Sequence, residues 1–241
     1  MRNRIGTSAL PHEQTPLSDL FHVKPGIPDR TWPEWLVPHL GPLEQFADIL
    51  ATAGLDRGLL GPREIDRLWD RHLLNCVVVV DPLAGVVPLG SRVADVGSGA
   101  GLPGLAWAIT RPDLRVTLVE PLLRRSLFLV ETVKALGLDS RVDVVRARAE
   151  DVRHESAWTP ADIATARAVA PLRRLLDWTV PLLRSSGTLI ALKGQSAADE
   201  VAEARAEIAR HRLASCEVRL LTSDYLVDPT TVVIAQAGAA Q

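Results

Sequence analysis

The sequence predicts an α/β fold built on a seven-stranded, mostly parallel sheet with helices on both faces, preceded by a helical arm. Beyond Gly90, short runs rich in β-branched residues alternate with stretches in which apolar residues recur at helical spacing. This alternation is typical of parallel βαβ units, in which each helix covers one face of the sheet. The last two runs follow each other without a helix, which predicts a terminal antiparallel pair.

The chain before the predicted sheet divides into two parts. Residues 1–42 are rich in proline, and we expect a mobile start followed by an irregular segment. Residues 43–88 form the predicted helical arm, which contains two helices with apolar stripes. The first of them ends at Gly54, and the second stops near Pro82.

The third part, residues 89–241, carries the predicted sheet, and its elements can be placed in order. The predicted strands are residues 92–97, 115–120, 141–147, 161–169, 187–194, 217–223 and 230–236. The predicted helices are residues 102–110, 124–137, 172–183 and 198–213.

Composition excludes several classes of protein. A chain of 241 residues with 47% apolar residues can bury a large core in one main domain. No run of eighteen apolar residues occurs and the start lacks the apolar stretch of a secretory signal, so we expect a soluble, cytoplasmic protein. Cys76 and Cys216 lie far apart, which predicts reduced thiols and no zinc site. The net charge of −2 argues against a uniformly basic nucleic-acid binder but not against a local basic face.

The stretch "ADVGSGAGLPG" at residues 94–104 follows the first predicted strand. In an open parallel sheet, ligands bind beyond the carboxyl ends of the strands, and glycines at the first turn permit the closest approach. Three alternating glycines, Gly97, Gly99 and Gly101, exceed what one tight turn requires. The turn therefore predicts a ligand against the backbone.

One candidate ligand is a dinucleotide. The spacing Gly99-x-Gly101-x-x-Gly104 matches the dinucleotide fingerprint, and Glu120 stands at the end of the second strand, where a ribose acceptor belongs. A single GxGxxG is weak evidence, so a nicotinamide-dependent oxidoreductase is the lesser interpretation.

The other candidate is S-adenosylmethionine. The register Asp95-x-Gly97-x-Gly99-x-Gly101 resembles the first motif of class I S-adenosylmethionine-dependent methyltransferases, which have a Rossmann-like fold, and the terminal antiparallel pair points the same way. A dinucleotide places a pyrophosphate on a helix N-terminus, whereas S-adenosylmethionine carries an ammonium and a sulfonium, which the carboxylate of Asp95 would complement. Glu120 is then the expected acceptor for both ribose hydroxyls.

Two further acidic residues follow the third predicted strand, where adenine would lie. Glu150 or Asp151 could accept a hydrogen bond from the exocyclic amine of adenine, or could instead cap the next segment. The residues themselves leave this choice open.

Motifs that the sequence lacks narrow the choice of methyl acceptor. Methylation of an exocyclic base amine usually needs an Asp/Asn-Pro-Pro-aromatic loop after the fourth strand, where this chain has "TARAVAPL". Methylation of pyrimidine C5 needs a cysteine nucleophile, and neither cysteine lies near that loop. Guanine N7 carries a free lone pair and needs only alignment. Arg167 is placed to address the O6 edge of such a base, or to form a salt bridge with a neighbouring carboxylate.

Several segments together resemble the ribosomal small-subunit methyltransferase G family, also called glucose-inhibited division protein B. They span residues 43–236 and include "LWDRHLLNC", "GSGAGLPG" followed by "RPDL", "RARAED", "TARAVAPL" and "LIALKG". The resemblance implies methylation of N7 of one guanine in the 530 loop of 16S ribosomal RNA, with S-adenosylmethionine as donor. It implies as partner the small ribosomal subunit or its assembly intermediate.

Position by position, the resemblance implies a set of cofactor contacts, which are Gly97, Leu102, Ala149, Glu150 and Arg167. It also implies cleft-facing residues without naming a certain catalyst, and these are Arg71, His72 and Lys193. His72 lies in an apolar stripe and could equally be a hydrogen-bonded core histidine. The chain departs from the family at Asn75, where many members have aspartate, and at "GLLGPREI", which replaces Asn-Leu-Thr. How the arm meets RNA is therefore open.

Arginines near the carboxyl edge of the predicted sheet are candidates for phosphate contacts, which would offset the cost of unstacking a loop guanine. Each single one could also be part of a solvated helix face. The candidates are Arg71, Arg124, Arg125, Arg146, Arg148, Arg173 and Arg174.

Taken as a whole, these features predict a monomer that binds neither a membrane nor a metal. Two other functions remain compatible with them, a small-molecule methyltransferase of the same fold and a regulatory protein that binds the cofactor without turnover.

Overall fold

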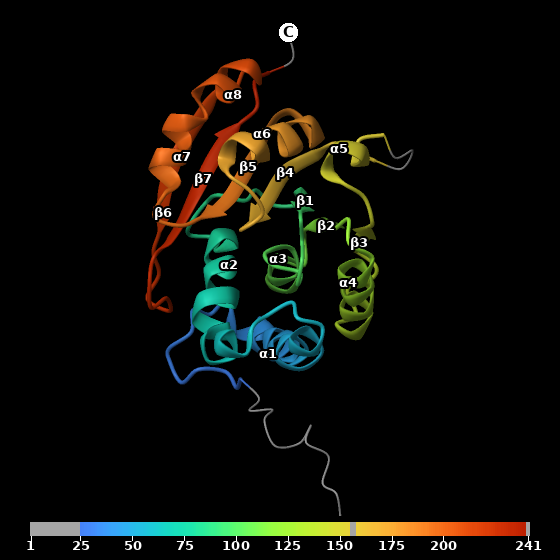
Figure 1. The fold of residues 1–241 in the computed structure, drawn as a ribbon. Helices are drawn as coiled ribbons and strands as arrows, with labels where there is room; N and C mark the ends of the chain where they lie inside the picture. Colours follow the sequence, from blue (N-terminus) through green and yellow to red (C-terminus); the bar gives the residue numbers. More distant parts are fainter. Residues whose placement is uncertain (1–24, 155–157, 240–241) are drawn as a thin grey trace, which may run out of the picture.

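Seven strands form one central sheet, and all seven were predicted from the sequence. They are β1 (Arg92–Val96), β2 (Arg115–Val119), β3 (Val142–Val145), β4 (Ala161–Arg167), β5 (Leu183–Lys193), β6 (Ser215–Leu221) and β7 (Thr230–Gln236). Their order across the sheet is β3-β2-β1-β4-β5-β7-β6 (Figure 1). The first five strands are parallel, and β7 runs antiparallel to β5 and β6, which confirms the terminal antiparallel pair.

This computed structural model describes residues 25–154 and 158–239. The mobile start was predicted within the proline-rich residues 1–42. Of these, residues 1–24 lie outside the described residues.

The fifth strand begins earlier than predicted, at Leu183 instead of Gly187. Ala161 of β4 pairs with Leu183, but Ile163 pairs with Thr188, so the register shifts between the two pairs. The extra residues form an irregularity in β5 that the two-residue periodicity of a strand does not reveal.

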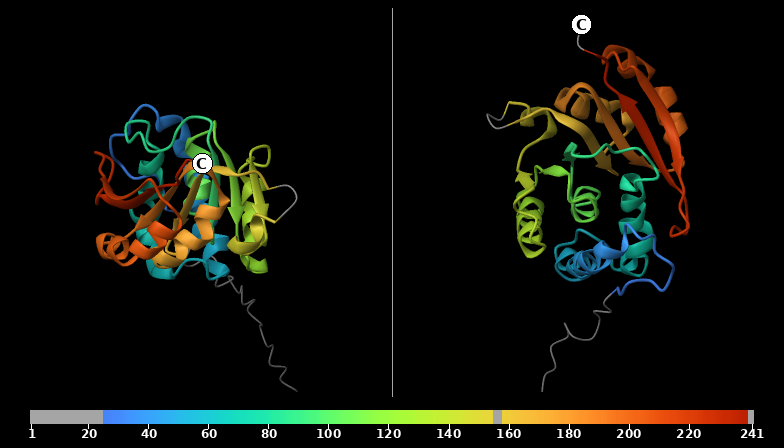
Figure 2. Two further views of the ribbon diagram at one scale, coloured as in Figure 1. Left: turned by 90° about the horizontal axis from the view of Figure 1, so that it is seen from above. Right: turned by 180° about the vertical axis from the view of Figure 1, so that it is seen from behind.

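Helices cover both faces of the sheet, as predicted (Figures 1 and 2). One face carries α3 (Gly104–Thr110) and α4 (Leu123–Ala135). The other carries α5 (Ala149–Val152), α6 (Leu172–Thr179), α7 (Ala197–Glu203) and α8 (Arg205–Arg210).

The prediction of one helix over residues 198–213 was wrong, because α7 and α8 are separate. The break lies at Ala204, which is fully buried and whose N–H contacts the carbonyls of both Glu200 and Val201. Both helices pack against α6. The apolar stripe runs through the break unchanged, so only the packing of the two halves discloses it.

The arm consists of α1 (Leu40–Ile49), continued by a π-helical turn, and a second helical segment over residues 62–80. The second segment was predicted as one regular helix. It instead passes in turn through a 3-10 segment, a π-helical segment, the α-helical turn α2 (Asn75–Val77) and a final 3-10 turn (Val78–Val80). Nearly every residue from Leu73 to Val80 is buried. Packing on several sides, rather than along one stripe, therefore sets the local helical pitch.

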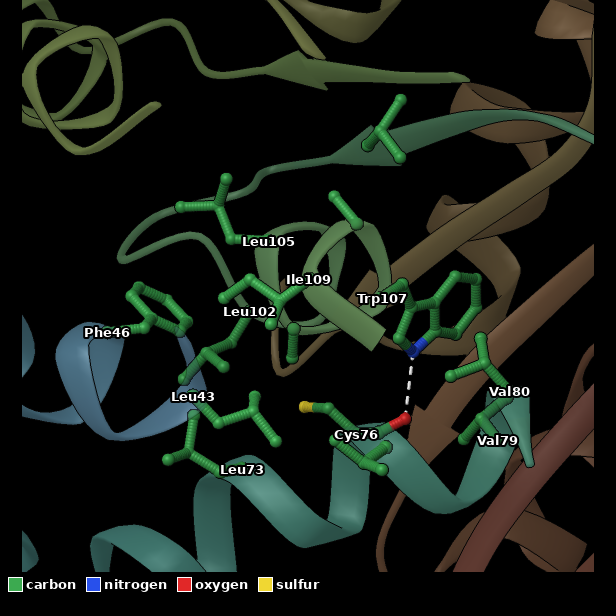
Figure 3. Close-up of a cluster of buried hydrophobic side chains, with 14 of the residues drawn as sticks. Leu43, Phe46, Leu73, Cys76, Val79, Val80, Leu102, Leu105, Trp107 and Ile109 are labelled. Atoms are coloured by element: carbon green, nitrogen blue, oxygen red, sulfur yellow. Dashed lines mark hydrogen bonds between the residues drawn. The ribbon is translucent and has the colours of Figure 1, made fainter. Parts of the chain in front are cut away.

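The arm and the sheet share one hydrophobic core (Figure 3). Leu43 and Phe46 of α1 lie opposite Leu102, which precedes α3. The indole N–H of Trp107, on α3, donates to the carbonyl of Cys76 at 2.8 Å. These contacts fix the arm against the helix that follows the glycine turn, so the arm is held at one wall of any site there.

The segment before α1 follows an irregular path and is anchored by aromatic contacts. The rings of Trp32 and Trp69 lie 6.2 Å apart, and those of Trp32 and Tyr225 6.4 Å. Trp69 donates its indole N–H to the carbonyl of Pro25 at 2.7 Å, and Arg30 donates to the carbonyl of Tyr225. The segment thereby ties the arm to the loop between β6 and β7.

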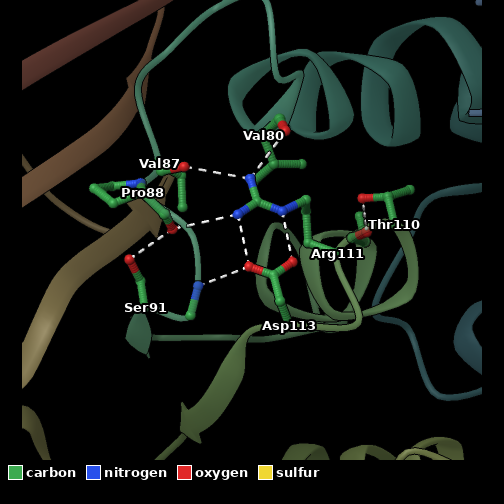
Figure 4. Close-up of polar contacts among 9 residues, drawn as sticks. Val80, Val87, Pro88, Ser91, Thr110, Arg111 and Asp113 are labelled. Atoms are coloured by element: carbon green, nitrogen blue, oxygen red, sulfur yellow. Dashed lines mark hydrogen bonds and ion pairs between the residues drawn. The ribbon is translucent and has the colours of Figure 1, made fainter. Parts of the chain in front are cut away.

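The link between the arm and β1 is held by a buried arginine, Arg111 (Figure 4). Its guanidinium binds Asp113 in bidentate geometry at 2.7 and 2.8 Å. It also donates to the carbonyls of Val80, Val87 and Pro88 at 3.3–3.4 Å. This arginine pairing holds the pKa of Asp113 at about 2.

Candidate functional site

A cavity of about 570 Å³ lies where β1, β2 and β4 end. Its position beyond the carboxyl ends of parallel strands and its size are those of a cofactor site. The cavity is lined by many of the residues that the sequence analysis singled out. These are His72, Gly97, Gly99, Leu102, Glu120, Arg125, Arg148, Ala149, Glu150 and Arg167.

The glycine turn is bare because a side chain would not fit at its first glycine. Gly97 has a φ of +72°, and a Cβ there would lie 2.8 Å from a methyl group of Val169, which follows β4. Only glycine adopts this positive φ without strain and also leaves room for Val169. The N–H groups of Gly97 and Ser98 donate to the carbonyl of Val119, which holds the turn against the end of β2.

Glu120 is fixed at the cavity wall by the backbone around it. The residue is 2% exposed. Its Oε2 accepts the N–H of Gly99 and its Oε1 the N–H of Leu122, both at 3.0 Å. Each carboxylate oxygen keeps further acceptor capacity. The carboxylate is thus oriented to receive two neighbouring hydroxyls, such as those of a ribose.

Asp95, whose carboxylate was expected to complement a cationic ligand, lies behind the glycine turn and does not line the cavity. Its side chain is fully buried, and Oδ2 accepts the N–H of Gly104 at 3.0 Å. Within the described part of the chain, Oδ1 has no hydrogen-bond partner. Burial raises the pKa of Asp95 to about 7. Gly101 also lies outside the cavity lining.

The same carboxylate argues against the nicotinamide interpretation. A dinucleotide would place its pyrophosphate at the start of α3. There the N–H of Gly104 already binds Asp95, and a Cβ on Gly104 would lie 2.6 Å from Asp95 Oδ2. The third glycine of the fingerprint thus serves the packing of this carboxylate.

Replacing Asp95 with asparagine is expected to stabilise the protein at pH 8 and to weaken binding of S-adenosylmethionine. The folded pKa of about 7 exceeds the ordinary 3.8. Between these two pKa values the carboxyl of Asp95 keeps its proton in the folded protein but loses it in the unfolded chain. The free energy of unfolding therefore falls as the pH rises through this range. Asparagine keeps an oxygen for Gly104 and removes the buried charge, a gain on the order of 1–3 kcal/mol. Affinity falls because the negative charge behind the glycine turn, which would complement a cationic ligand at a distance, is lost. Thermal unfolding from pH 5 to pH 8 and a binding titration measure both effects, and a variant no more stable than wild type at pH 8 contradicts the first.

Some cavity residues escaped the sequence analysis. Ser98, which is 2% exposed, lies inside the glycine turn and could have been found there. Leu59 and Trp178 carry no such signal. They reach the cavity only because the arm and α6 pack beside it.

Arg167, at the end of β4, lines the cavity and is bound to the arm. Its Nη2 lies 2.7 Å from Nδ1 of His72 and 3.0 Å from the carbonyl of Arg71. Its Nη1 lies 3.1 Å from the carbonyl of His72 and 3.5 Å from Sγ of Cys76. The salt bridge considered for it is absent among the described residues. His72 is both hydrogen-bonded and part of the cavity wall.

A second, more polar cavity of about 1250 Å³ adjoins the first, and Arg167, Ala168 and Val169 line both. Arg71 and Lys193 lie here rather than in the first cavity. The ammonium of Lys193 binds Glu200 and the carbonyl of Ala170, each at 2.7 Å. Its position at the end of β5 agrees with a cleft-facing residue.

The arginines considered for RNA contact fall into different settings. Arg125 and Arg148 line the first cavity. Arg124 donates to the carbonyl of Asp56 at 3.4 Å, and Arg146 is exposed. Arg173 pairs with Glu207 at 3.2 Å, outside both cavities. The guanidinium of Arg174 lies 5.7 Å from the ring centre of Trp178, which lines the first cavity.

Residues 25–154 and 158–239 contain no cluster of three or more His, Cys, Asp or Glu side chains that could hold a metal ion. Over the same stretches, no helix has the length and apolar character needed to cross a membrane.

Comparison with known proteins identifies relatives along most of the chain. A family described as rRNA small subunit methyltransferase G matches residues 40–225. A protein named ribosomal RNA small subunit methyltransferase G from Nocardioides sp. (strain ATCC BAA-499 / JS614) is 50% identical over 215 residues, which cover 89% of this chain and 83% of the relative. A protein of the same name from Thermobifida fusca (strain YX) is 53% identical over 191 residues, covering 79% of this chain and 77% of the relative.

Solved structures agree on the fold. The METTL16 MTase domain aligns with a TM-score of 0.55 at 16% identity, over 84% of this chain and 81% of its own. The S-adenosylmethionine-dependent methyltransferase SibL in its apo form aligns with a TM-score of 0.55 at 17% identity, over 85% of this chain and 70% of its own. The predicted Rossmann-like fold of class I methyltransferases is thereby confirmed. With half of its residues identical to curated relatives over most of its length, this chain belongs to the rRNA small subunit methyltransferase G family.

Proposed function

We propose that this protein transfers the methyl group of S-adenosylmethionine to N7 of a guanine in the 530 loop of 16S ribosomal RNA. The observation that carries the proposal is the pair of adjoining cavities, which share Arg167, Ala168 and Val169. The first has the size of a cofactor site, and the second is large and polar enough for a nucleotide. Membership of the family supports ribosomal RNA as the substrate.

The residues of the first cavity fit S-adenosylmethionine. Glu120 would bind the ribose hydroxyls, and Gly97 and Gly99 would lie against the methionine part. A side chain has no room at Gly97, and the positive φ of Gly99, +55°, favours glycine there. Ala149 and Glu150 would border adenine. The buried charge of Asp95, behind the turn, would favour the cationic end of the ligand.

When bound, S-adenosylmethionine supplies an electrophilic methyl group on a cationic sulfur. The lone pair of guanine N7 attacks it directly, so this chain needs no general base for the transfer. What its residues must provide is alignment of N7 with the methyl carbon and exclusion of competing water. The wall shared by the two cavities, from Arg167 to Val169, is where such alignment would occur.

Arginine and lysine side chains around the cavities would hold the RNA. A loop guanine must leave its stack to reach the methyl group, at a cost of a few kcal/mol. Arg125 and Arg148 at the first cavity and Arg71 at the second are positioned for the flanking phosphates. The protein would act as a monomer on the small subunit or its assembly intermediate in the cytoplasm.

The test uses tritiated S-adenosylmethionine with the purified protein and small-subunit particles from a strain that lacks the endogenous methylation. Borohydride reduction and aniline treatment then cleave the RNA chain at N7-methylguanine. We expect one scission, in the 530 loop. Labelled RNA without scission would exclude N7. No label in particles, assembly intermediates or naked RNA would favour the small-molecule methyltransferase instead.

A further inference from the structure

His72 connects the arm to the cavity wall through both of its ring nitrogens. Nε2 lies 2.6 Å from Oε2 of Glu64, and Nδ1 lies 2.7 Å from Nη2 of Arg167. Glu64 and His72 belong to the arm, whereas Arg167 ends β4. The His72 side chain is 12% exposed, so these contacts form largely out of water.

The chemistry of the three groups determines where the histidine proton lies. A guanidinium only donates hydrogen bonds, so Nδ1 of His72 must accept from Arg167. A carboxylate accepts, so Nε2–H donates to Glu64. The arrangement is therefore satisfied by the neutral ring protonated at Nε2. A doubly protonated ring would point Nδ1–H at the N–H of Arg167.

The contacts of Arg167 show what this ring holds in place. Its two Nη groups carry four hydrogens, and they face four arm acceptors: the carbonyls of Arg71 and His72, Nδ1 of His72 and Sγ of Cys76. Only Nε–H is left for other partners. The Nη groups of Arg167, which the sequence placed at the O6 edge of guanine, are thus engaged in joining β4 to the arm.

We propose that Glu64 and His72 are positioning residues, which hold Arg167 at the boundary between the two cavities through the Nε2-protonated neutral ring, and that a second proton on His72 releases Arg167 from it. The part of this inference that concerns RNA methylation rests on the proposed function.

Burial and the neighbouring arginines favour the neutral form of His72. Burial and then the charge of Arg167 lower the pKa of His72 below its ordinary 6.5, and Arg71 acts in the same direction. Glu64 opposes them. Cys76 contacts Arg167 from α2, and burial raises the pKa of its thiol, so it stays uncharged.

The sign of the pH effect follows from these directions. Because the pKa of His72 is lowered in the folded protein, the stabilising contacts are fully present above pH 6.5 and are lost as the pH falls through the lowered pKa. Activity should therefore fall on the acid side, at a pH below that of an ordinary histidine.

Three variants separate this role from general packing. In His72→Asn, the amide oxygen takes the place of Nδ1 and accepts from Arg167 without titrating. In His72→Gln, the amide group extends to the place of Nε2 and leaves Arg167 without its acceptor. The control is His211→Asn, which alters another histidine–carboxylate pair, 2.7 Å from Asp177, remote from both cavities.

The experiment measures kcat/KM for methylation of small-subunit particles from pH 5 to pH 8, with 15N NMR of the histidine rings. We expect wild type and His211→Asn to lose activity in acid with the same inflection, and His72→Asn to lack that inflection. We expect His72→Gln to be roughly 10-fold less active at pH 8, the effect of one lost hydrogen bond to a charged group. The NMR should show a bare Nδ1 and a protonated Nε2 on His72.

A ring protonated at Nδ1 in the NMR spectrum at pH 8 would overturn the inference, as would an unchanged acid inflection in His72→Asn. If wild type methylates no RNA, the proposed function fails, but the spectra still decide this proposal. In that case, loss of the Arg167 guanidinium signal on titration of His72 supports it, and a signal independent of that titration refutes it.

Discussion

Replacing Glu120 with glutamine is expected to weaken binding of S-adenosylmethionine on the order of 10²–10³-fold, because about 1.5–3 kcal/mol is lost for each hydrogen bond to the charged carboxylate. Glutamine has only one acceptor oxygen, so it cannot accept from both loop N–H groups, those of Gly99 and Leu122, and also from two ribose hydroxyls. A titration that follows tryptophan fluorescence, to which Trp178 of the same cavity contributes, measures the dissociation constant.

The matched control is Glu150→Gln, the same chemical change at an exposed position of the same cavity. We expect it to change affinity less than about tenfold, because water replaces much of what an exposed carboxylate provides. Wild-type affinity in Glu120→Gln, or equal losses in the two variants, would show that Glu120 does not bind the ribose.

Replacing Arg111 with methionine is expected to lower the free energy of unfolding by about 2–4 kcal/mol. Methionine fills similar space but donates no hydrogen bond, so three backbone carbonyls and Asp113 lose their partner. Removing one member of a buried ion pair costs about 3–5 kcal/mol, and the lower range applies because Asp113 is 32% exposed. These carbonyls belong to the end of the arm and to the link that leads to β1 (Figure 4). The lost hydrogen bonds therefore weaken the attachment of this link.

Urea unfolding at pH 7 and pH 3, with the exposed Arg115→Met as control, checks this prediction. The Arg111 pairing lowers the pKa of Asp113 from 3.8 to about 2. Its contribution is therefore present above about pH 4 and is lost as the pH falls towards 2. The difference between wild type and Arg111→Met should shrink at pH 3. A difference that is equal at both pH values, or that also appears in Arg115→Met, would assign the loss to packing alone.

The strands and the cofactor turn could be predicted from the sequence because their signals are local. Alternating β-branched runs mark strands wherever both faces are covered. The spacing of Gly97 and Gly99 marks a backbone that something must approach. Glu120 was predictable for the same reason, since the end of the second parallel strand always meets the turn after the first. Chain order alone therefore places these residues around one cavity.

Tertiary structure decided what depends on packing between distant segments. The break at Ala204 follows from two helix halves packing on α6, which leaves the apolar stripe intact. The sequence placed Asp95 near the cationic part of the cofactor, and only folding shows that it is buried behind the turn, binds the N–H of Gly104 and has a raised pKa. Arg167 has its roles fixed by acceptors about ninety residues earlier in the chain. The sequence by itself thus determined the order of elements and the residues at the strand ends, because these depend on neighbours in the chain. Only the tertiary structure decided which of those side chains face the ligand and which hold other side chains. This depends on burial and on the donors and acceptors that folding brings together.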